Sequence, residues 1–388
     1  MNFYFPRVNL AQSILDDLLG KNPFGDAANG YFLAAPRRTG KSSFLKNDLQ
    51  PLLQTSQITV IYVDLWSDKN KDPASLIADA IGKEINKSLG VIAKAAKSSG
   101  LESISVAGLL KIDTSKIGKS EGVTLYDALN TLQQNTNRPV ALIIDEAQHA
   151  LTSSTGEDTM TSLKSARDQM NVPGKTKLML IMSGSDRDKL LRLVNSNSAP
   201  FFGSSIKTMP LLDEHFIHYV TQLIDQHLPH IKTIDETHLM SAFALFGHRP
   251  QFFTRALGEV LNPLNEPKAG FENLIFEAAK THISDEQARM ESQYQGLRLL
   301  ERAIIWRLLE QGGKFRPYDA EALKFYTEKT AAKKQITPAQ VQSAIDILRA
   351  LTPSMIWKSA RGEYALDDAL MHAWYQRRVE EGTWPPKE

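Results

Sequence analysis

A short loop near the N-terminus combines a glycine, a lysine and a serine at the spacing of a phosphate-binding loop. The window Ala35–Ser42 reads APRRTGKS, which meets the pattern G-x-x-x-x-G-K-[ST] everywhere but at the first position. In such a loop, consecutive backbone N–H groups wrap the phosphates at a helix N-terminus. Gly40 lets the backbone approach closely, Lys41 reaches the β- and γ-phosphates, and the Ser42 hydroxyl binds Mg²⁺. The residues expected to bind the nucleotide are Pro36, Arg37, Arg38, Thr39, Gly40, Lys41, Ser42 and Ser43.

The first position of this loop departs from the pattern, because Ala35 stands where glycine is usual. A chance G-K-S triplet is one explanation. The context favours a working loop instead, since the apolar run YFLAA precedes it and the helix-like stretch KSSFLKNDLQPLL follows it. Alanine adds only a methyl group, which is tolerated if the position has an ordinary negative φ. We therefore expect a variant loop that still binds a nucleotide.

Two adjacent acids, Asp145 and Glu146, end the apolar run VALII. Carboxylates at the end of a buried strand are costly unless a cation or a water-filled site receives them. Together with the loop, they predict that Asp145 and Ser42 hold Mg²⁺ while Glu146 polarises the attacking water and Lys41 assists catalysis. The alternative is a helix N-terminus, where the dipole favours acids. It explains one acid well, but not the pair together with the upstream loop.

Two further positions are weaker candidates for catalytic residues. The run LMLIMS ends at Ser183, whose hydroxyl would sense the γ-phosphate, although polar residues end most strands. Arg249 lies in the turn Gly247–Pro250 between two helical stretches. From there its cation would reach back over the nucleotide, and a plain interhelical turn is the alternative.

The elements that must position these residues alternate in the first half of the chain between apolar runs and helix-like stretches. This alternation is typical of an α/β domain with a largely parallel sheet. The expected strands are Tyr31–Ala35, Thr59–Leu65, Pro139–Ile144 and Lys177–Ser183. Between the second and third lies a glycine-rich segment, residues 86–122, which we interpret as an insertion. Within it, ISVAGLLKID is a candidate hairpin.

The second half of the sequence is predominantly helical. Helical spacing of apolar residues is found in Asp213–Gln226, Asp235–Phe246 and Glu259–His282. From Gly296 onward, three helical stretches precede two short β-like runs around Arg361-Gly362, which is the order of a winged helix. The sequence thus predicts a P-loop core over residues 1–211, a helical lid over 212–290 and a winged helix over 291–388.

Composition sets broad limits on the class of protein. The 388 residues are 42% hydrophobic, as is ordinary for a globular chain, and contain no run of the roughly 18 apolar residues that a membrane span needs. The net charge of +1 gives no global argument for nucleic acid, so any DNA contact must come from a local patch. The absence of cysteine and of a secretory-signal layout leads us to expect a cytoplasmic protein without membrane partners.

With these motifs in this order, the chain resembles the archaeal-type P-loop ATPases, which are related to the AAA+ and STAND ATPases and similar to origin-recognition proteins. The resemblance rests on the P-R-R style of the loop, the D-E-x-Q run, the strand ending S-G-S and the G-H-R-P turn. It extends over roughly Phe5 to Thr281, and the ending YALDDALMHAWY is similar to the close of that group's winged helix. The resemblance implies ATP and Mg²⁺ as cofactors and ATP hydrolysis as the activity. One departure is Ser204, which stands where the group tends to carry an arginine, with Arg187 and Arg192 as conceivable substitutes.

Two functions stay open at this point. One is an ATPase that binds double-stranded DNA through the winged helix. The other is a slowly hydrolysing, STAND-like switch that binds a protein partner. Either function is compatible with a nucleotide-dependent oligomer. A P-loop kinase or GTPase is less favoured, since no N-K-x-D run is present. The expected recognition helix, residues 337–351, carries only one cation, Arg349, close to Asp346. Further basic candidates lie around it: Lys329, Lys333, Lys334, Lys358 and Arg361.

Overall fold

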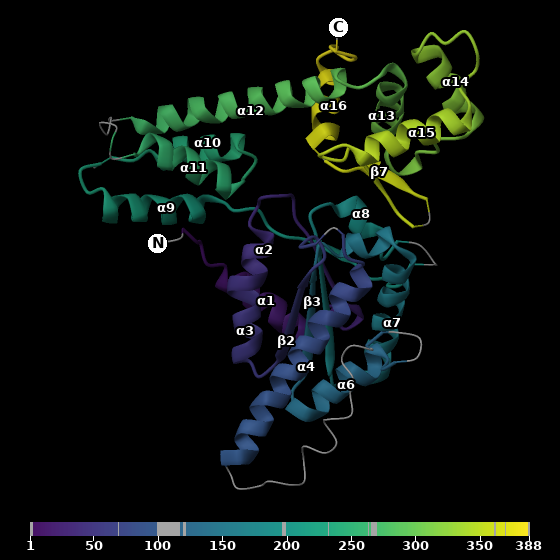
Figure 1. Ribbon diagram of the computed structural model, residues 1–388. Coiled ribbons are helices and arrows are strands. Elements are labelled where there is room, and N and C mark those ends of the chain that lie inside the picture. The colour runs from purple at the N-terminus through teal and green to yellow at the C-terminus, as the bar shows by residue number, and fades with distance from the viewer. Residues whose placement is uncertain are drawn as a thin grey trace. The chain divides into compact units, whose positions relative to one another are not determined.

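The chain divides into two compact units, Met1–Leu211 and Leu212–Glu388, each of which is described by itself (Figure 1). The computed structural model describes residues 3–68, 70–98, 117–118, 122–195, 199–231, 233–262, 264, 270–360, 362–368 and 370–386. The candidate hairpin ISVAGLLKID and the basic candidate Arg361 lie outside these residues.

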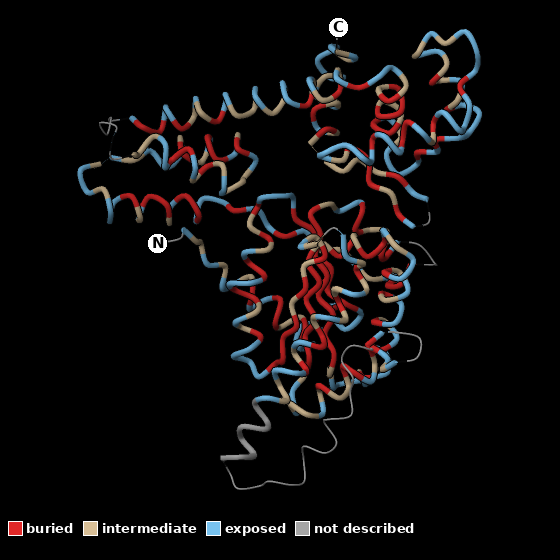
Figure 2. The backbone as a smooth tube through the Cα atoms, viewed as in Figure 1, coloured by how far each residue is buried: buried red, intermediate tan, exposed pale blue. Residues whose placement is uncertain are grey.

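The first unit is built on a five-stranded parallel sheet with the strand order β2-β3-β4-β1-β5, which confirms the predicted α/β class. The strands are β1 (Tyr31–Ala34), β2 (Thr59–Asp64), β3 (Val140–Asp145), β4 (Leu178–Gly184) and β5 (Ile206–Thr208). Every residue of β1, β3 and β4 is buried (Figure 2), as expected for strands covered on both faces. The fifth strand was not expected from the sequence, because it is only three residues long and partly exposed.

Helices cover both faces of this sheet. On one face, α1 (Val8–Leu18) packs beside the continuous helical stretch formed by α2 (Lys41–Phe44), a π-turn (Leu45–Leu49) and α3 (Gln50–Thr55). The other face is covered by α4 (Pro73–Ser98), α6 (Leu125–Thr136) and α7 (Ser154–Met170). The π-turn comes just before Pro51, whose missing N–H and bulky ring disfavour a regular i→i+4 turn there.

The structure corrects where the expected insertion, residues 86–122, begins. The segment predicted as a loose insertion from residue 86 begins inside α4, which continues to Ser98. The buried residues Ile77, Ile81 and Ile85 repeat every four positions and so keep one face of the helix against the protein. Gly90 is exposed and does not interrupt the helix, since an isolated glycine costs only about 1 kcal/mol relative to alanine.

The parallel sheet brings the candidate chemistry to one edge. All five strands end at the same edge, so the loop after β1, the acids at the end of β3 and the polar end of β4 converge there. The register pairs Asp64 with Asp145 and Leu33 with Ser183. Two short segments follow at this edge: a 3₁₀ turn, Ala147–Thr152, after β3 and α8 (Arg187–Leu191) after β4.

The second unit begins with four helices: α9 (Glu214–His227), α10 (Glu236–Leu245), α11 (Pro250–Val260) and α12 (Phe271–Gln295). The single helical stretch expected over Glu259–His282 is wrong, because α11 ends at Val260 and α12 begins only after Gly270, which has a φ of +80°. The helix α12 also runs through the domain boundary expected at residues 290–291.

The remainder of this unit follows the expected order of three helices and a hairpin. The elements are α13 (Leu299–Gln311), α14 (Ala320–Lys329), α15 (Pro338–Ala350), β6 (Ile356–Lys358), β7 (Tyr364–Leu366) and α16 (Leu370–Glu380). Strands β6 and β7 are antiparallel, and these elements share one hydrophobic core. Among the described residues, no helix combines the length and the apolar character that crossing a membrane requires.

Candidate functional site

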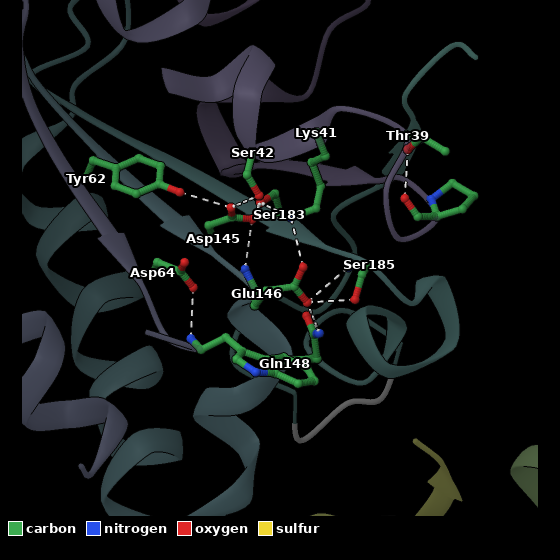
Figure 3. A network of polar contacts seen from close by, with 12 residues as sticks. Thr39, Lys41, Ser42, Tyr62, Asp64, Asp145, Glu146, Gln148, Ser183 and Ser185 are labelled. Atoms are coloured by element: carbon green, nitrogen blue, oxygen red, sulfur yellow. Dashed lines mark hydrogen bonds and ion pairs between the residues drawn. The ribbon is translucent and has the colours of Figure 1, made fainter. Parts of the chain in front are cut away.

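Asp145, at the end of β3, is the centre of a buried network of polar contacts (Figure 3). Its Oδ1 accepts hydrogen bonds from the Lys41 ammonium, from the Ser183 hydroxyl and, at 3.0 Å, from the backbone N–H of Glu146. Its Oδ2 accepts from the Ser42 hydroxyl at 2.5 Å and from the Tyr62 hydroxyl at 3.0 Å. The predicted loop residues, the acid and the strand-end serine are therefore brought together around one carboxylate.

The environment of Asp145 keeps it ionised. Burial alone raises the pKa of this carboxyl group, but the adjacent Lys41 cation and the hydrogen bonds from Ser183 and Ser42 outweigh burial and lower its pKa to about 2. Lys41 itself is 5% exposed and Asp145 is 0% exposed, so each charge depends on the other for compensation. The site thus holds a fixed negative charge beside a fixed positive charge.

Glu146 is held by contacts on both of its carboxylate oxygens. Oε1 lies 3.0 Å from the Lys41 ammonium. Oε2 accepts hydrogen bonds from the Gln148 amide at 2.6 Å and from the Ser185 hydroxyl at 2.7 Å. Burial raises the pKa of Glu146, but Lys41 and these donors together lower it by more. The net effect is a pKa below the ordinary value of a glutamate. Glu146 is therefore an ionised carboxylate able to accept a proton from water.

The backbone of the loop has the left-handed conformations that a phosphate-wrapping turn requires. Gly40, which precedes α2, has a φ of +91°, and Arg38 has a φ of +68°. A Cβ on Gly40 would meet no atom within 4 Å, so glycine is needed there for its φ and not for space. Ala35 is buried and its φ is not positive, so the alanine at the first position causes no backbone strain. Thr39 closes the turn by donating to the Pro36 carbonyl at 2.7 Å.

A stack of side chains that the sequence did not suggest borders the loop. The Arg37 guanidinium lies 4.6 Å from the centroid of the Trp66 ring, and the Trp66 and His149 rings meet edge to face at a centroid distance of 4.6 Å. The three residues follow β1, β2 and β3, so each lies just beyond the carboxyl end of its strand. The stack therefore connects the loop to the segment that follows the two acids.

The residues of this site fit ATP with Mg²⁺. A hydroxyl and an ionised carboxylate are hard oxygen ligands, and Mg²⁺ is usually held by one or two such groups together with substrate phosphates. Lys41 and the N–H groups at the start of α2 are donors of the kind that phosphates bind.

Other predicted positions lie away from this network. Ser43 and Pro36 are exposed. Ser204 donates to the Asn29 carbonyl at 3.2 Å, and Arg187 is exposed at the start of α8. In the second unit, Arg249 precedes α11 and forms an ion pair of 2.9 Å with Glu286. Its expected action on the nucleotide stays a prediction.

The basic residues considered for DNA binding in the second unit differ in the contacts that they make. Lys329 lies 3.9 Å from the centroid of the Trp306 ring, and Lys358 lies 5.4 Å from that of Tyr364. Arg349 on α15 is 3.6 Å from Asp346, so the one cation of that helix is paired. Lys333 and Lys334 are exposed in the segment that leads into α15.

Tyr62 is the contact to Asp145 that the sequence reasoning missed. It lies on β2, two positions before Asp64, and alternation places these two side chains on the same face of the sheet. Two polar side chains on one face of an otherwise apolar strand were the signal available in the sequence. The contact also depends on the register of β2 against β3, which no local pattern reveals.

The chain is similar to known proteins in one family model and in its fold. Residues 26–193 match the family model described as an AAA domain. No curated protein sequence matches the chain. A similar solved structure is the ADP form of the Aeropyrum pernix ORC2 protein, with 15% identity, a TM-score of 0.50, and 98% of this chain and 97% of that chain covered. At this identity the likeness shows a shared fold.

Two further structures from Aeropyrum pernix are also similar. The ADPNP-ADP complexes of the ORC2 protein give 13% identity and a TM-score of 0.49, covering 99% of this chain and 97% of that chain. The ORC1 protein in complex with DNA gives 13% identity and a TM-score of 0.45, covering 97% of this chain and 94% of that chain.

Proposed function

We propose that this chain, whose residues 26–193 match the model of an AAA domain, is a Mg²⁺-dependent ATPase that couples its nucleotide state to double-stranded DNA or to a protein partner. One observation carries the proposal: a buried lysine at the start of α2 is joined to a buried aspartate at the end of β3, with Ser42 and Glu146 against the same pair. We place this activity in the cytoplasm and expect a nucleotide-dependent oligomer.

The binding roles follow from the chemistry of each group. The loop from Pro36 to Ser43 wraps the phosphates with its backbone N–H groups, and Lys41 adds a cation that is already desolvated. Ser42 and Asp145 hold Mg²⁺, which supplies charge neutralisation at the phosphates. Ser183 donates to Asp145 and is 3.2 Å from the Lys41 ammonium, so it is suited to respond when Lys41 turns toward a phosphate.

Hydrolysis requires Glu146 to act on a water molecule. In the structure, Lys41 contacts Oε1, and Gln148 and Ser185 donate hydrogen bonds to Oε2. Phosphates that attract Lys41 release Oε1, which then accepts a proton from the attacking water. Arg249, freed from Glu286, is the cation proposed to act on the phosphates from the second unit.

Two observations bear on the partner. The three helices and hairpin of the second unit support a winged helix, and the exposed Lys333 and Lys334 before α15 support contact with DNA phosphates. The pairing of Arg349 with Asp346, together with Ser204 in place of an arginine, favours the second candidate, a slow STAND-like switch that binds a protein.

ATP turnover measured with and without double-stranded DNA separates these candidates. We expect DNA to stimulate turnover, and the double variant Lys333→Ala/Lys334→Ala to lose this stimulation while its turnover without DNA is unchanged. Lys324→Ala, an exposed lysine on α14, is the matched control. Measurable ATP binding with negligible turnover at every DNA concentration would instead support the switch.

A further inference from the structure

The Tyr62 hydroxyl and the Ser42 hydroxyl donate to the same oxygen of Asp145. Ser42 lies 2.5 Å and Tyr62 3.0 Å from Oδ2, whereas Lys41 and Ser183 take Oδ1. The carboxylate is thus divided: one oxygen faces the lysine, and the other is shared by a serine and a tyrosine (Figure 3). Among the three hydroxyl donors, Tyr62 is the one to which the motif pattern gives no role.

The position of Tyr62 is fixed by the fold from two sides. The backbone register pairs Tyr62 with Ile143, two residues before Asp145, so its long side chain reaches diagonally toward the carboxyl edge of the sheet. Its ring packs against the core beneath the helical stretch 41–55, and the ammonium of Lys46 from that stretch lies 4.9 Å from the ring centroid. A ring held in this way leaves its hydroxyl little freedom.

The Tyr62 hydroxyl is placed to donate to the carboxylate, 3.0 Å from Oδ2 of Asp145. A neutral O–H beside an ionised carboxylate donates and cannot compete with it as an anion. Tyr62 therefore fixes the orientation of the carboxylate without adding charge to the site.

We propose that Tyr62 is a positioning residue for Asp145, the proposed Mg²⁺ ligand. Its hydroxyl holds Oδ2 of Asp145 against the Ser42 hydroxyl, so that this carboxylate oxygen and the serine oxygen are both positioned to bind the cation. The inference rests on the proposed function, because it assigns a role toward the metal of that same site. It concerns metal-assisted binding only, since Tyr62 donates to the acid and not to the phosphate-binding lysine. Removing its hydroxyl is therefore expected to weaken the effect of Mg²⁺ and to spare binding of the nucleotide alone.

The test measures the affinity of the full chain for a fluorescent ATP analogue, once with excess Mg²⁺ and once with EDTA. Tyr62→Phe removes one oxygen atom and keeps the ring. We expect its affinity in EDTA to equal that of the wild type, and the gain in affinity on adding Mg²⁺ to fall about tenfold or more, as for the loss of one hydrogen bond to a charged group. Tyr126→Phe on α6 is the matched control, and we expect it to behave as wild type in both conditions.

The other outcomes each overturn the inference, in distinguishable ways. An equal loss of affinity with and without Mg²⁺ would mean that Tyr62 acts on the fold or the loop in general. Unchanged affinity in both conditions would mean that its hydroxyl is dispensable. A wild type that does not bind the analogue would overturn the proposed function itself. Circular dichroism of Tyr62→Phe verifies folding, and Tyr62→Leu, which also lacks the hydroxyl, replaces it if the phenylalanine variant does not fold.

Discussion

The ammonium group of Lys41 lies 3.0 Å from Oε1 of Glu146 and also donates to Asp145, so one cation holds both acids of the site. Lys41 is 5% exposed and is the nearest compensating charge for both carboxylates. In the proposed function, phosphates entering the loop would compete with two acids for this lysine. That competition would release Glu146 to act as the base, and so link occupancy of the site to hydrolysis.

Replacing Glu146 by glutamine separates binding from chemistry. Glutamine keeps the size of the side chain and can still contact Gln148 and Ser185, but it cannot take a proton from water. We expect ATP turnover to fall by about 100-fold or more while ATP affinity changes little. Steady-state turnover and equilibrium binding measured on the same preparation test this. Turnover at the wild-type rate would remove Glu146 from the mechanism.

The stability of the first unit should depend on pH through Asp145. Its pKa is about 2 in the folded protein against an ordinary value of 3.8. Because the folded-state pKa is the lower one, this stabilisation is complete above about pH 4 to 5 and is lost as the pH falls toward 2. Its size is about 2 kcal/mol.

Urea unfolding between pH 2 and pH 5 measures this contribution. Asp145→Asn should remove it, leaving a free energy of unfolding that varies less over this range. Asp79→Asn, an exposed acid on α4, is the control and should retain the wild-type slope. Identical pH profiles for the wild type and Asp145→Asn would show that Asp145 is not held as described.

Much of the site could be predicted from the sequence because short motifs and parallel strands work together. Apolar runs gave four of the strands, and parallel strands must end at one edge, so Lys41, Asp145 and Ser183 had to converge. The loop needed no tertiary information, since its glycine and lysine are set by the chemistry of phosphate binding.

The parts that were missed depend on contacts between distant segments. The hydrogen bond of Tyr62 to Asp145 requires the register of two strands that are about 80 residues apart. The ion pair of Arg249 with Glu286 requires the packing of α11 against α12. The fifth strand was missed because three partly exposed residues carry too little periodicity to be recognised.

Gly184 should not tolerate a side chain, although its φ is ordinary. A Cβ there would lie 2.6 Å from Oε1 of Gln148 and 3.3 Å from a methyl group of Leu190. Gln148 is 1% exposed and donates to Glu146, so it cannot move aside without disturbing the acid. We expect Gly184→Ala to lower the free energy of unfolding by about 1 to 3 kcal/mol.

Thermal or urea unfolding compares this variant with Gly90→Ala. Gly90 lies in α4 with nothing within 4 Å of the added Cβ, so this control should be neutral or slightly stabilising. Equal stability of the two variants would contradict the close packing of Gln148 against β4.

Trp66 should report nucleotide binding by its fluorescence. It is the one tryptophan of residues 1–211, and Arg37 of the loop lies over its ring at 4.6 Å. We expect phosphates bound by the loop to shift Arg37 and so to change the emission of the indole. The change on adding ATP should disappear in Trp66→Phe and shrink in Arg37→Ala. A change of wild-type size in Trp66→Phe would assign the signal to the second unit.

Calorimetric titration of the purified protein with ATP and Mg²⁺ determines whether the loop around Lys41 binds ATP. Lys41→Ala is compared with Lys87→Ala, an exposed lysine on α4. We expect saturable binding at one site per chain for the wild type and Lys87→Ala, and affinity at least about tenfold weaker, a loss of about 1.4 kcal/mol, for Lys41→Ala. Absence of binding by the wild type, or equal affinity of Lys41→Ala, would contradict this expectation.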